Sequence, residues 1–268
     1  MGDEQQPRKL YIMRHAERMD LTFGYGPAWM KKCFDEQDNY IRTDLNMPLS
    51  VPKRKGSQRD YIYDCPLTRI GLVQATFAGE AIKSRNVKFS HVFSSPSLRC
   101  METCRKVLEA SDQIHLPINV EPGLFEWLEW YVKEMPKWMS PEEMKENGFN
   151  VSEDYIPVMN ETEILGRKET CEEYYERSFK VASDVLQKYS GKILFVGHAS
   201  TLDACSRQLV GQQPKNEADM MKCITKLPLT AIAAVELDSG SQWKLIEPPI
   251  LPPTHLKNAA FDWRILLD

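Results

Sequence analysis

The sequence lacks several features that would assign it to common classes of protein. No stretch is apolar for the roughly 18 residues that a membrane-spanning helix needs. The seven cysteines are scattered and include no C-x-x-C pair, so we expect neither a disulfide framework nor a zinc site. The net charge of −4 argues against a general nucleic-acid binder. These absences favour a cytoplasmic protein with reduced thiols.

The sequence also indicates how the N-terminus and the domain are organised. Residues Met1–Gln6 are polar, which does not fit a signal peptide. No internal repeat or low-complexity linker is present, and 268 residues with 42% hydrophobic content suffice for one large domain or two small ones. We expect a flexible tail over residues 1–8 and a single domain over 9–268. Insertions are expected at about 21–65 and 123–165.

Histidine is scarce, yet two of the five histidines directly follow apolar segments typical of buried strands. Leu10–Met13 leads into Arg14 and His15, and Lys192–Val196 leads through a glycine to His198. A neutral imidazole can attack phosphorus, and arginine side chains can hold the phosphate oxygens meanwhile. The pattern indicates a phosphate site, although a surface histidine beside ordinary charges would explain the first segment alone.

Strands and helices are predicted to alternate along the chain. Thr68 is a suitable N-cap for a helix that ends near Ser84. Ser95 is the expected N-cap of another helix, with Pro96 at its first position, which would place Arg99 close to an anion-attracting helix N-terminus. Further strands are predicted at 91–94, 118–120 and 192–196, further helices at 171–189 and about 201–210, and a hairpin at 231–237 and 243–246.

This alternation predicts an α/β fold with a mostly parallel central sheet and helices on both faces. Functional residues should then lie at the carboxyl ends of the strands, where both histidines fall. The basic turn Lys53–Arg59 is interpreted as a solvated loop, with a rim that attracts anionic substrates as the alternative.

Several separated motifs carry a resemblance to a known family. They are Arg14–Asp20, Ser94–Cys100, Glu121–Trp127, Gly197–Ala199 and Asn258–Arg264. Together they resemble the histidine phosphatase (phosphoglycerate-mutase-like) superfamily, and within it the phosphatase domain of the Sts/TULA (UBASH3) group, which includes insect ecdysteroid-phosphate phosphatases. The resemblance runs from about residue 9 to the C-terminus. Ala16 and Ala199 depart from it, because the family usually has glycine there.

The resemblance implies a metal-independent phosphomonoesterase that needs no cofactor. His15 is the expected nucleophile, which would form a phosphohistidine that water then hydrolyses. Nearby guanidinium groups should lower the pKa of His15, and its other ring nitrogen should donate to a carbonyl. Arg14, Arg18 and Arg99 are the expected phosphate clamp. His198 is expected to donate a hydrogen bond to the phosphoryl group.

Glu126 is the candidate general acid. Its apolar neighbours Phe125 and Trp127 would raise its pKa, whereas the arginine cluster would lower it, and the sequence does not decide between the two. Glu17 and Glu129 are competitors, although Glu17 is better explained as a structural partner of its loop.

Several alternatives were weighed against this hypothesis. A cysteine-dependent phosphatase needs an arginine six residues after its cysteine, but Cys100 and Arg105 are five apart. A metallophosphatase needs clustered ligands that five scattered histidines do not provide. A phosphosugar mutase and a phosphate-binding scaffold module remain as alternatives. Expected substrates are a bulky organic phosphate, with steroid phosphate slightly favoured over protein phosphotyrosine, and the family suggests a homodimer.

Overall fold

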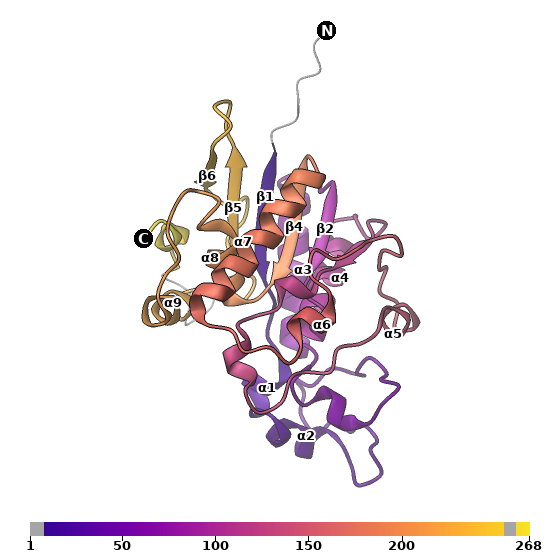
Figure 1. Ribbon diagram of the computed structural model, residues 1–268. Coiled ribbons are helices and arrows are strands. Elements are labelled where there is room, and N and C mark those ends of the chain that lie inside the picture. The colour runs from indigo at the N-terminus through magenta and orange to yellow at the C-terminus, as the bar shows by residue number, and fades with distance from the viewer. Residues whose placement is uncertain (1–7, 255–260) are drawn as a thin grey trace.

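A mixed β-sheet forms the centre of the molecule (Figure 1). The computed structural model describes residues 8–254 and 261–268. Within these residues the sheet has six strands in the order β3-β2-β4-β1-β5-β6. Strands β1, β2, β3 and β4 pair in parallel, whereas β5 pairs antiparallel with both β1 and β6. The strands are β1 (Lys9–Arg14), β2 (His91–Ser94), β3 (Ile118–Val120), β4 (Lys192–Gly197), β5 (Ile232–Leu237) and β6 (Trp243–Ile246).

Helices cover both faces of the sheet. Because successive strand residues point to opposite faces, Tyr11 and Met13 join one core cluster while Leu10 and Ile12 join another. The first cluster includes apolar residues of α3 and α4, and the second includes those of α7 and α8. The helices are α1 (Met19–Phe23), α2 (Pro27–Cys33), α3 (Arg69–Ser84), α4 (Leu98–Ala110), α5 (Pro141–Glu146), α6 (Glu161–Ile164), α7 (Cys171–Lys188), α8 (Ala199–Ser206) and α9 (Glu217–Ile224). Short 3-10 turns are η1 (Gln58–Tyr61), η2 (Pro122–Leu124), η3 (Leu128–Tyr131) and η4 (Trp263–Leu266).

The predicted fold class is confirmed, and most predicted elements lie within two residues of the observed ones. Thr68 caps α3 by accepting a hydrogen bond from the Gly71 amide at 2.9 Å. The helix after β4 starts at Ala199 and ends at Ser206, earlier at both ends than predicted. Residues 1–7 of the expected tail and 258–260 of the C-terminal motif lie outside the described residues. Arg8 is held by the Tyr189 carbonyl at 3.3 Å.

The start of α4 differs from the prediction. Ser95 does not cap this helix, which begins at Leu98 after Ser97. The Asp64 carboxylate, from the first insertion, accepts a hydrogen bond from the Leu98 amide at 2.7 Å. Ser95 instead lies with its hydroxyl 3.0 Å from Nε2 of His198. The helix N-terminus is therefore satisfied by a residue more than thirty positions away in the sequence.

The two insertions bind each other rather than lying apart. The Lys53 amide donates to Oδ1 of Asn147 at 2.6 Å, and Nζ of Lys137 lies 2.9 Å from the Asp60 carboxylate. Arg54 belongs to the basic turn that was expected to be solvated, yet its side chain is 2% exposed and pairs with Asp64 at 3.1 Å. The turn therefore links the second insertion to the N-terminus of α4.

The polypeptide shows no sign of a membrane-crossing helix in the described ranges. None of the helices there combines the length and the apolar character that a bilayer span requires.

Candidate active site

The parallel pairing of β1 with β4 brings the two predicted histidines together. Arg14 pairs in register with Gly197, so the residues that follow both strands leave the sheet side by side. The His15 amide donates to the Gly197 carbonyl at 2.8 Å. The two imidazole rings are buried, and their centroids lie 5.6 Å apart with the planes at 71°.

His15 has the geometry of a nucleophile. Its Nδ1 lies 2.8 Å from the Ala16 carbonyl, and because a carbonyl only accepts, Nδ1 carries the proton and Nε2 keeps its lone pair. Burial, with Arg99 and Arg14 nearby, holds the pKa of His15 well below its ordinary value. The predicted carbonyl partner and the predicted pKa direction are thus both present, although burial is the larger cause. The methyl group of Ala16 packs into the core beneath the loop.

Arg99 lies at the centre of the cluster and is fully buried. Its Nη2 donates to Oε1 of Glu126, and it lies 3.3 Å from the Tyr131 hydroxyl and 3.2 Å from Nδ1 of His198. Among the described residues, no partner is found for its Nε and Nη1, although both atoms are buried. Two of the strongest donors in the site are therefore free to bind a ligand.

Arg14 and Arg18 differ in how many of their guanidinium nitrogens already have hydrogen-bond partners. Arg14 donates through Nη1 to the Leu227 carbonyl, and its buried Nε has no partner among the described residues. Burial and the neighbouring Arg18 lower the pKa of Arg14 to about 10. Arg18 is bound by both carboxylate oxygens of Asp20, at 2.5 and 2.6 Å, and only its Nη1 approaches Glu126, at 3.7 Å. Arg18 is thus less available than the other two.

Glu126 completes the cluster from the loop after β3. Burial alone would raise its pKa, but Arg99, Arg18 and the Tyr131 hydroxyl, which donates to it at 2.5 Å, outweigh burial and lower the pKa. The question that the sequence left open is answered, because the arginine cluster dominates and Glu126 is ionised without a ligand. Glu129 lies on the exposed surface and does not compete for this position.

A buried arginine holds the loop that carries Glu126. Arg177 donates to the carbonyls of Gly123 and Phe125, both at 2.8 Å, and forms an ion pair with Glu169 at 2.6 Å. The competitor Glu17 has the structural role that was expected of it. Its carboxylate accepts hydrogen bonds from Asn46 at 2.8 Å and from Thr68 at 2.7 Å.

His198 is buried between Ser95 and Glu126. Its Nε2 lies 3.0 Å from the Ser95 hydroxyl, and its Nδ1 lies 3.5 Å from Oε2 of Glu126. Burial and the arginines, Arg99 above all, hold the pKa of His198 well below its ordinary value. All six predicted residues therefore meet in one cluster, whereas Ser95, Tyr131 and Arg177 were not predicted as site residues. Of these three, only Ser95 could have been found from the sequence, because it directly follows a strand at the same edge of the sheet as the two histidines.

The cysteines and the metal-ligating side chains bear on the alternative chemistries. Burial raises the pKa of Cys100 to about 12, so this thiol is not poised as a nucleophile. All seven cysteines are buried free thiols. No group of three or more histidine, cysteine, aspartate or glutamate side chains with metal-binding geometry occurs within the described ranges.

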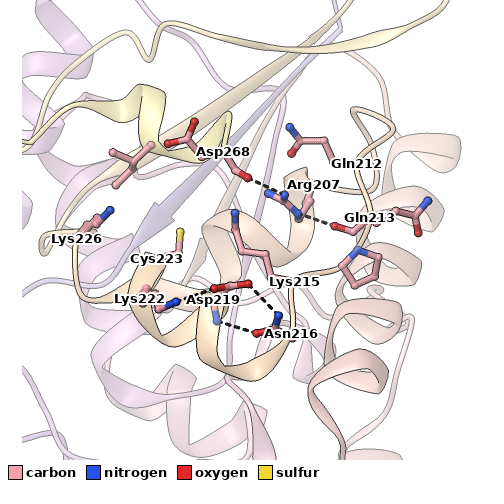
Figure 2. Close-up of a pocket in the computed structure, with 12 residues that line it drawn as sticks. Arg207, Gln212, Gln213, Lys215, Asn216, Asp219, Lys222, Cys223, Lys226 and Asp268 are labelled. Carbon is pink, nitrogen blue, oxygen red and sulfur yellow. Dashed lines mark hydrogen bonds and ion pairs between the residues drawn. The ribbon is translucent and has the colours of Figure 1, made fainter.

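A separate cleft of about 510 Å³ lies beside α9 (Figure 2). Figure 2 shows Arg207 between the backbone oxygens of Gln213 and Asp268, to which it donates at 2.6 and 3.1 Å. Lys222, also in this cleft, pairs with Asp219 at 3.0 Å. None of the six predicted site residues lines the cleft, and two of its four cationic side chains, Arg207 and Lys222, already form ion pairs.

Comparisons with known proteins identify similar sequences and one similar structure over almost the whole chain. The model of the histidine phosphatase superfamily (branch 1) matches residues 54–246, a span that begins after the loop carrying His15. The ecdysteroid-phosphate phosphatase of Drosophila melanogaster is 45% identical over 261 residues, which cover 97% of this chain and 34% of that protein. Human ubiquitin-associated and SH3 domain-containing protein B is 41% identical over 265 residues, covering 97% of this chain and 40% of that protein.

One solved structure is similar over almost its whole length. It is the ecdysone phosphate phosphatase of the silkworm Bombyx mori in complex with tungstate, which has a TM-score of 0.81 and 34% sequence identity. The similarity covers 97% of this chain and 99% of that chain. By contrast, the chain spans only 34% of the length of the Drosophila relative and 40% of the length of the human relative.

The depressed pKa values of the two buried histidines give the first prediction. We expect ¹⁵N NMR to show both rings still neutral at pH 6, with His15 protonated at Nδ1, because burial and the arginines disfavour a charged ring. In urea the imidazoles should titrate near the ordinary value of about 6.5. The unfolded chain then binds more protons below that pH, so acid should reduce the stability of the fold. Titration of either ring near 6.5 in the folded protein would contradict this account.

Proposed function

Because the chain belongs to the histidine phosphatase superfamily, we propose that it hydrolyses phosphate monoesters through a phosphohistidine on His15, without a metal ion. The observation that carries the proposal is the set of unpaired buried donors on Arg99 and Arg14 beside a neutral imidazole. A buried donor without a partner costs about 1–3 kcal/mol. A phosphate group offers the acceptor oxygens that would remove this cost.

The first step is transfer of the phosphoryl group to the enzyme. The lone pair on Nε2 of His15 attacks phosphorus, and the bond from phosphorus to the ester oxygen breaks. Arg14 and Arg99 bind the equatorial oxygens, where negative charge gathers in the transition state. Arg18 adds positive charge through Nη1, and His198 donates to the same phosphoryl group.

Glu126 supplies the proton that the leaving oxygen needs. Without a ligand the arginines keep this carboxyl ionised. A phosphate dianion shares the same guanidinium groups, so substrate binding weakens their hold on the carboxylate and allows it to bind a proton. In the second step water attacks phosphorus, the Glu126 carboxylate accepts its proton, and neutral His15 and inorganic phosphate are formed.

The proposed substrate is a bulky organic phosphate, most directly a steroid phosphate of the ecdysteroid class. The Drosophila and silkworm relatives are named for such compounds. Protein phosphotyrosine is the second candidate, because the human relative carries SH3 and ubiquitin-associated domains by name.

We further propose a cytoplasmic homodimer that packs through α3. Ile70, Val73 and Phe77 form an apolar stripe on this helix, each about half exposed, at 50%, 49% and 53%. Arg69 and Glu80 are exposed at opposite ends of the stripe. A second copy packed antiparallel on the same face would bring each Arg69 toward the partner's Glu80, as an isologous interface requires.

The nucleophile is tested by His15→Asn. We expect turnover of p-nitrophenyl phosphate to fall by roughly 10³-fold or more, because the phosphohistidine can no longer form. Wild-type turnover should persist in EDTA, and His115→Asn, at an exposed histidine, should match the wild type. Loss of activity in EDTA, or full activity of His15→Asn, would overturn the proposed mechanism. The ratio of kcat/KM for an ecdysteroid phosphate and a phosphotyrosine peptide then ranks the two substrate classes.

Glu126→Gln separates substrates by their leaving groups. A steroid alcohol leaves poorly without a proton, so we expect about 10²-fold or more loss of kcat/KM on the steroid phosphate, because kcat/KM reports phosphoryl transfer to His15 and not hydrolysis of the shared phosphohistidine. Nitrophenolate needs little protonation, and its rate should fall much less. The control is Glu129→Gln, at the exposed glutamate three residues along. Equal losses on both substrates would indicate that Glu126 is not the proton donor.

The dimer is tested by Phe77→Glu, which places a charge in the middle of the apolar stripe. Light scattering should show a dimer for the wild type and a monomer for the variant, since burying an unpaired charge is costly. Ile156→Glu is the matched control, because Ile156 is also exposed, at 82%, but lies on another segment. A wild-type monomer, or an unchanged dimer in Phe77→Glu, would reject this interface.

A further inference from the structure

We infer that Tyr131 is a positioning residue for Glu126, whose hydroxyl holds the acid in place and sets the pH range over which it can deliver its proton. The inference rests on the proposed function and deepens it, because it adds a residue of the second insertion to the same site.

The contacts of Tyr131 fix its hydroxyl in one place. The hydroxyl lies 2.5 Å from Oε1 of Glu126 and 3.3 Å from Nη2 of Arg99. The ring is buried and packs on Phe125 with centroids 5.0 Å apart, and edge-on against Tyr63 at 6.2 Å. With the ring held on two sides, the hydroxyl cannot turn away from the carboxylate without disturbing the loop after β3.

The direction of the hydrogen bond follows from the chemistry of the two groups. A carboxylate only accepts, so the Tyr131 hydroxyl donates to Glu126 and accepts from Arg99. Burial and the adjacent carboxylate raise the pKa of Tyr131 far above its ordinary value, so the phenol keeps its proton. The hydroxyl therefore stabilises the charged form of Glu126.

Tyr131 differs from the other groups around Glu126 in having no part in binding phosphate. The charged and titratable groups that face Glu126 are Tyr131, Arg14, Arg18, Arg99, His15, His198 and the thiol of Cys100, which makes no hydrogen bond to it. The arginines and histidines all have proposed roles toward the phosphoryl group. When a substrate draws the guanidinium groups to its own oxygens, the tyrosine hydroxyl remains as the neutral donor on the acid.

The test is the pH dependence of kcat/KM for Tyr131→Phe on a steroid phosphate, which needs the acid. Loss of the hydrogen bond should raise the pKa of Glu126, so the limb on which activity falls with rising pH should move upward by about one pH unit. On p-nitrophenyl phosphate, which needs little protonation, the profile should stay where it is. Tyr63→Phe is the matched control, because the Tyr63 ring contacts Tyr131 but its hydroxyl makes no hydrogen bond to Glu126.

A second measurement does not depend on turnover. The ¹³C shift of the Glu126 carboxyl carbon, followed against pH in the ligand-free protein, should show the same upward move in Tyr131→Phe and none in Tyr63→Phe. The role of Tyr131 would be overturned if the pKa of the Glu126 carboxyl stayed the same in Tyr131→Phe, or if it rose equally in both variants. If the carboxyl moves but the wild type hydrolyses neither substrate, the inference about Tyr131 holds and the proposed function fails.

Discussion

The register between β1 and β4 is the constraint on which the site depends. Arg14 pairs with Gly197, so the two loops that carry the histidines leave the sheet at the same level and can exchange a backbone hydrogen bond. A slip of one residue would turn every side chain of β1 to the opposite face. The alternation of Leu10 and Ile12 with Tyr11 and Met13 between two separate core clusters prevents that slip. Core packing thus fixes the register that brings the two histidine loops together.

The three guanidinium groups of the site, on Arg14, Arg18 and Arg99, outnumber its two carboxylates, on Glu126 and Asp20. Glu126 is the shared counter-ion of Arg99 and Arg18, while Asp20 occupies most of Arg18. Burial among these cations keeps the His15 imidazole unprotonated, and in the proposed mechanism the same cations bind the phosphate that this imidazole attacks. In that mechanism one electrostatic arrangement serves both nucleophilicity and binding, without a proton transfer to prepare His15.

Local patterns in the sequence were sufficient for the sheet, the principal helices and the placement of Arg14, His15 and His198, whereas Arg18, Arg99 and Glu126 were assigned through the resemblance to the family. Apolar strands that end at a histidine are visible in a short window, and Thr68 caps α3 through a neighbouring amide. The structure also contains contacts that no short window encodes. Asp64 caps α4 from thirty-four residues away, and Arg177 holds the loop of Glu126 from fifty-two and fifty-four residues away. The assignment of Ser95 as a cap was wrong for the same reason, since a distant carboxylate took that role.

The interlocked insertions have an evolutionary consequence. Asn147 and Lys137 of the second insertion bind the first, and the first supplies Asp64 to the helix that carries Arg99. An exchange of one insertion between relatives would leave its partner without these contacts and would loosen the start of that helix. Inheritance of the two segments as a matched pair would avoid this loss. Diversification of substrate range in this architecture should therefore proceed by concerted rather than independent change of the two loops.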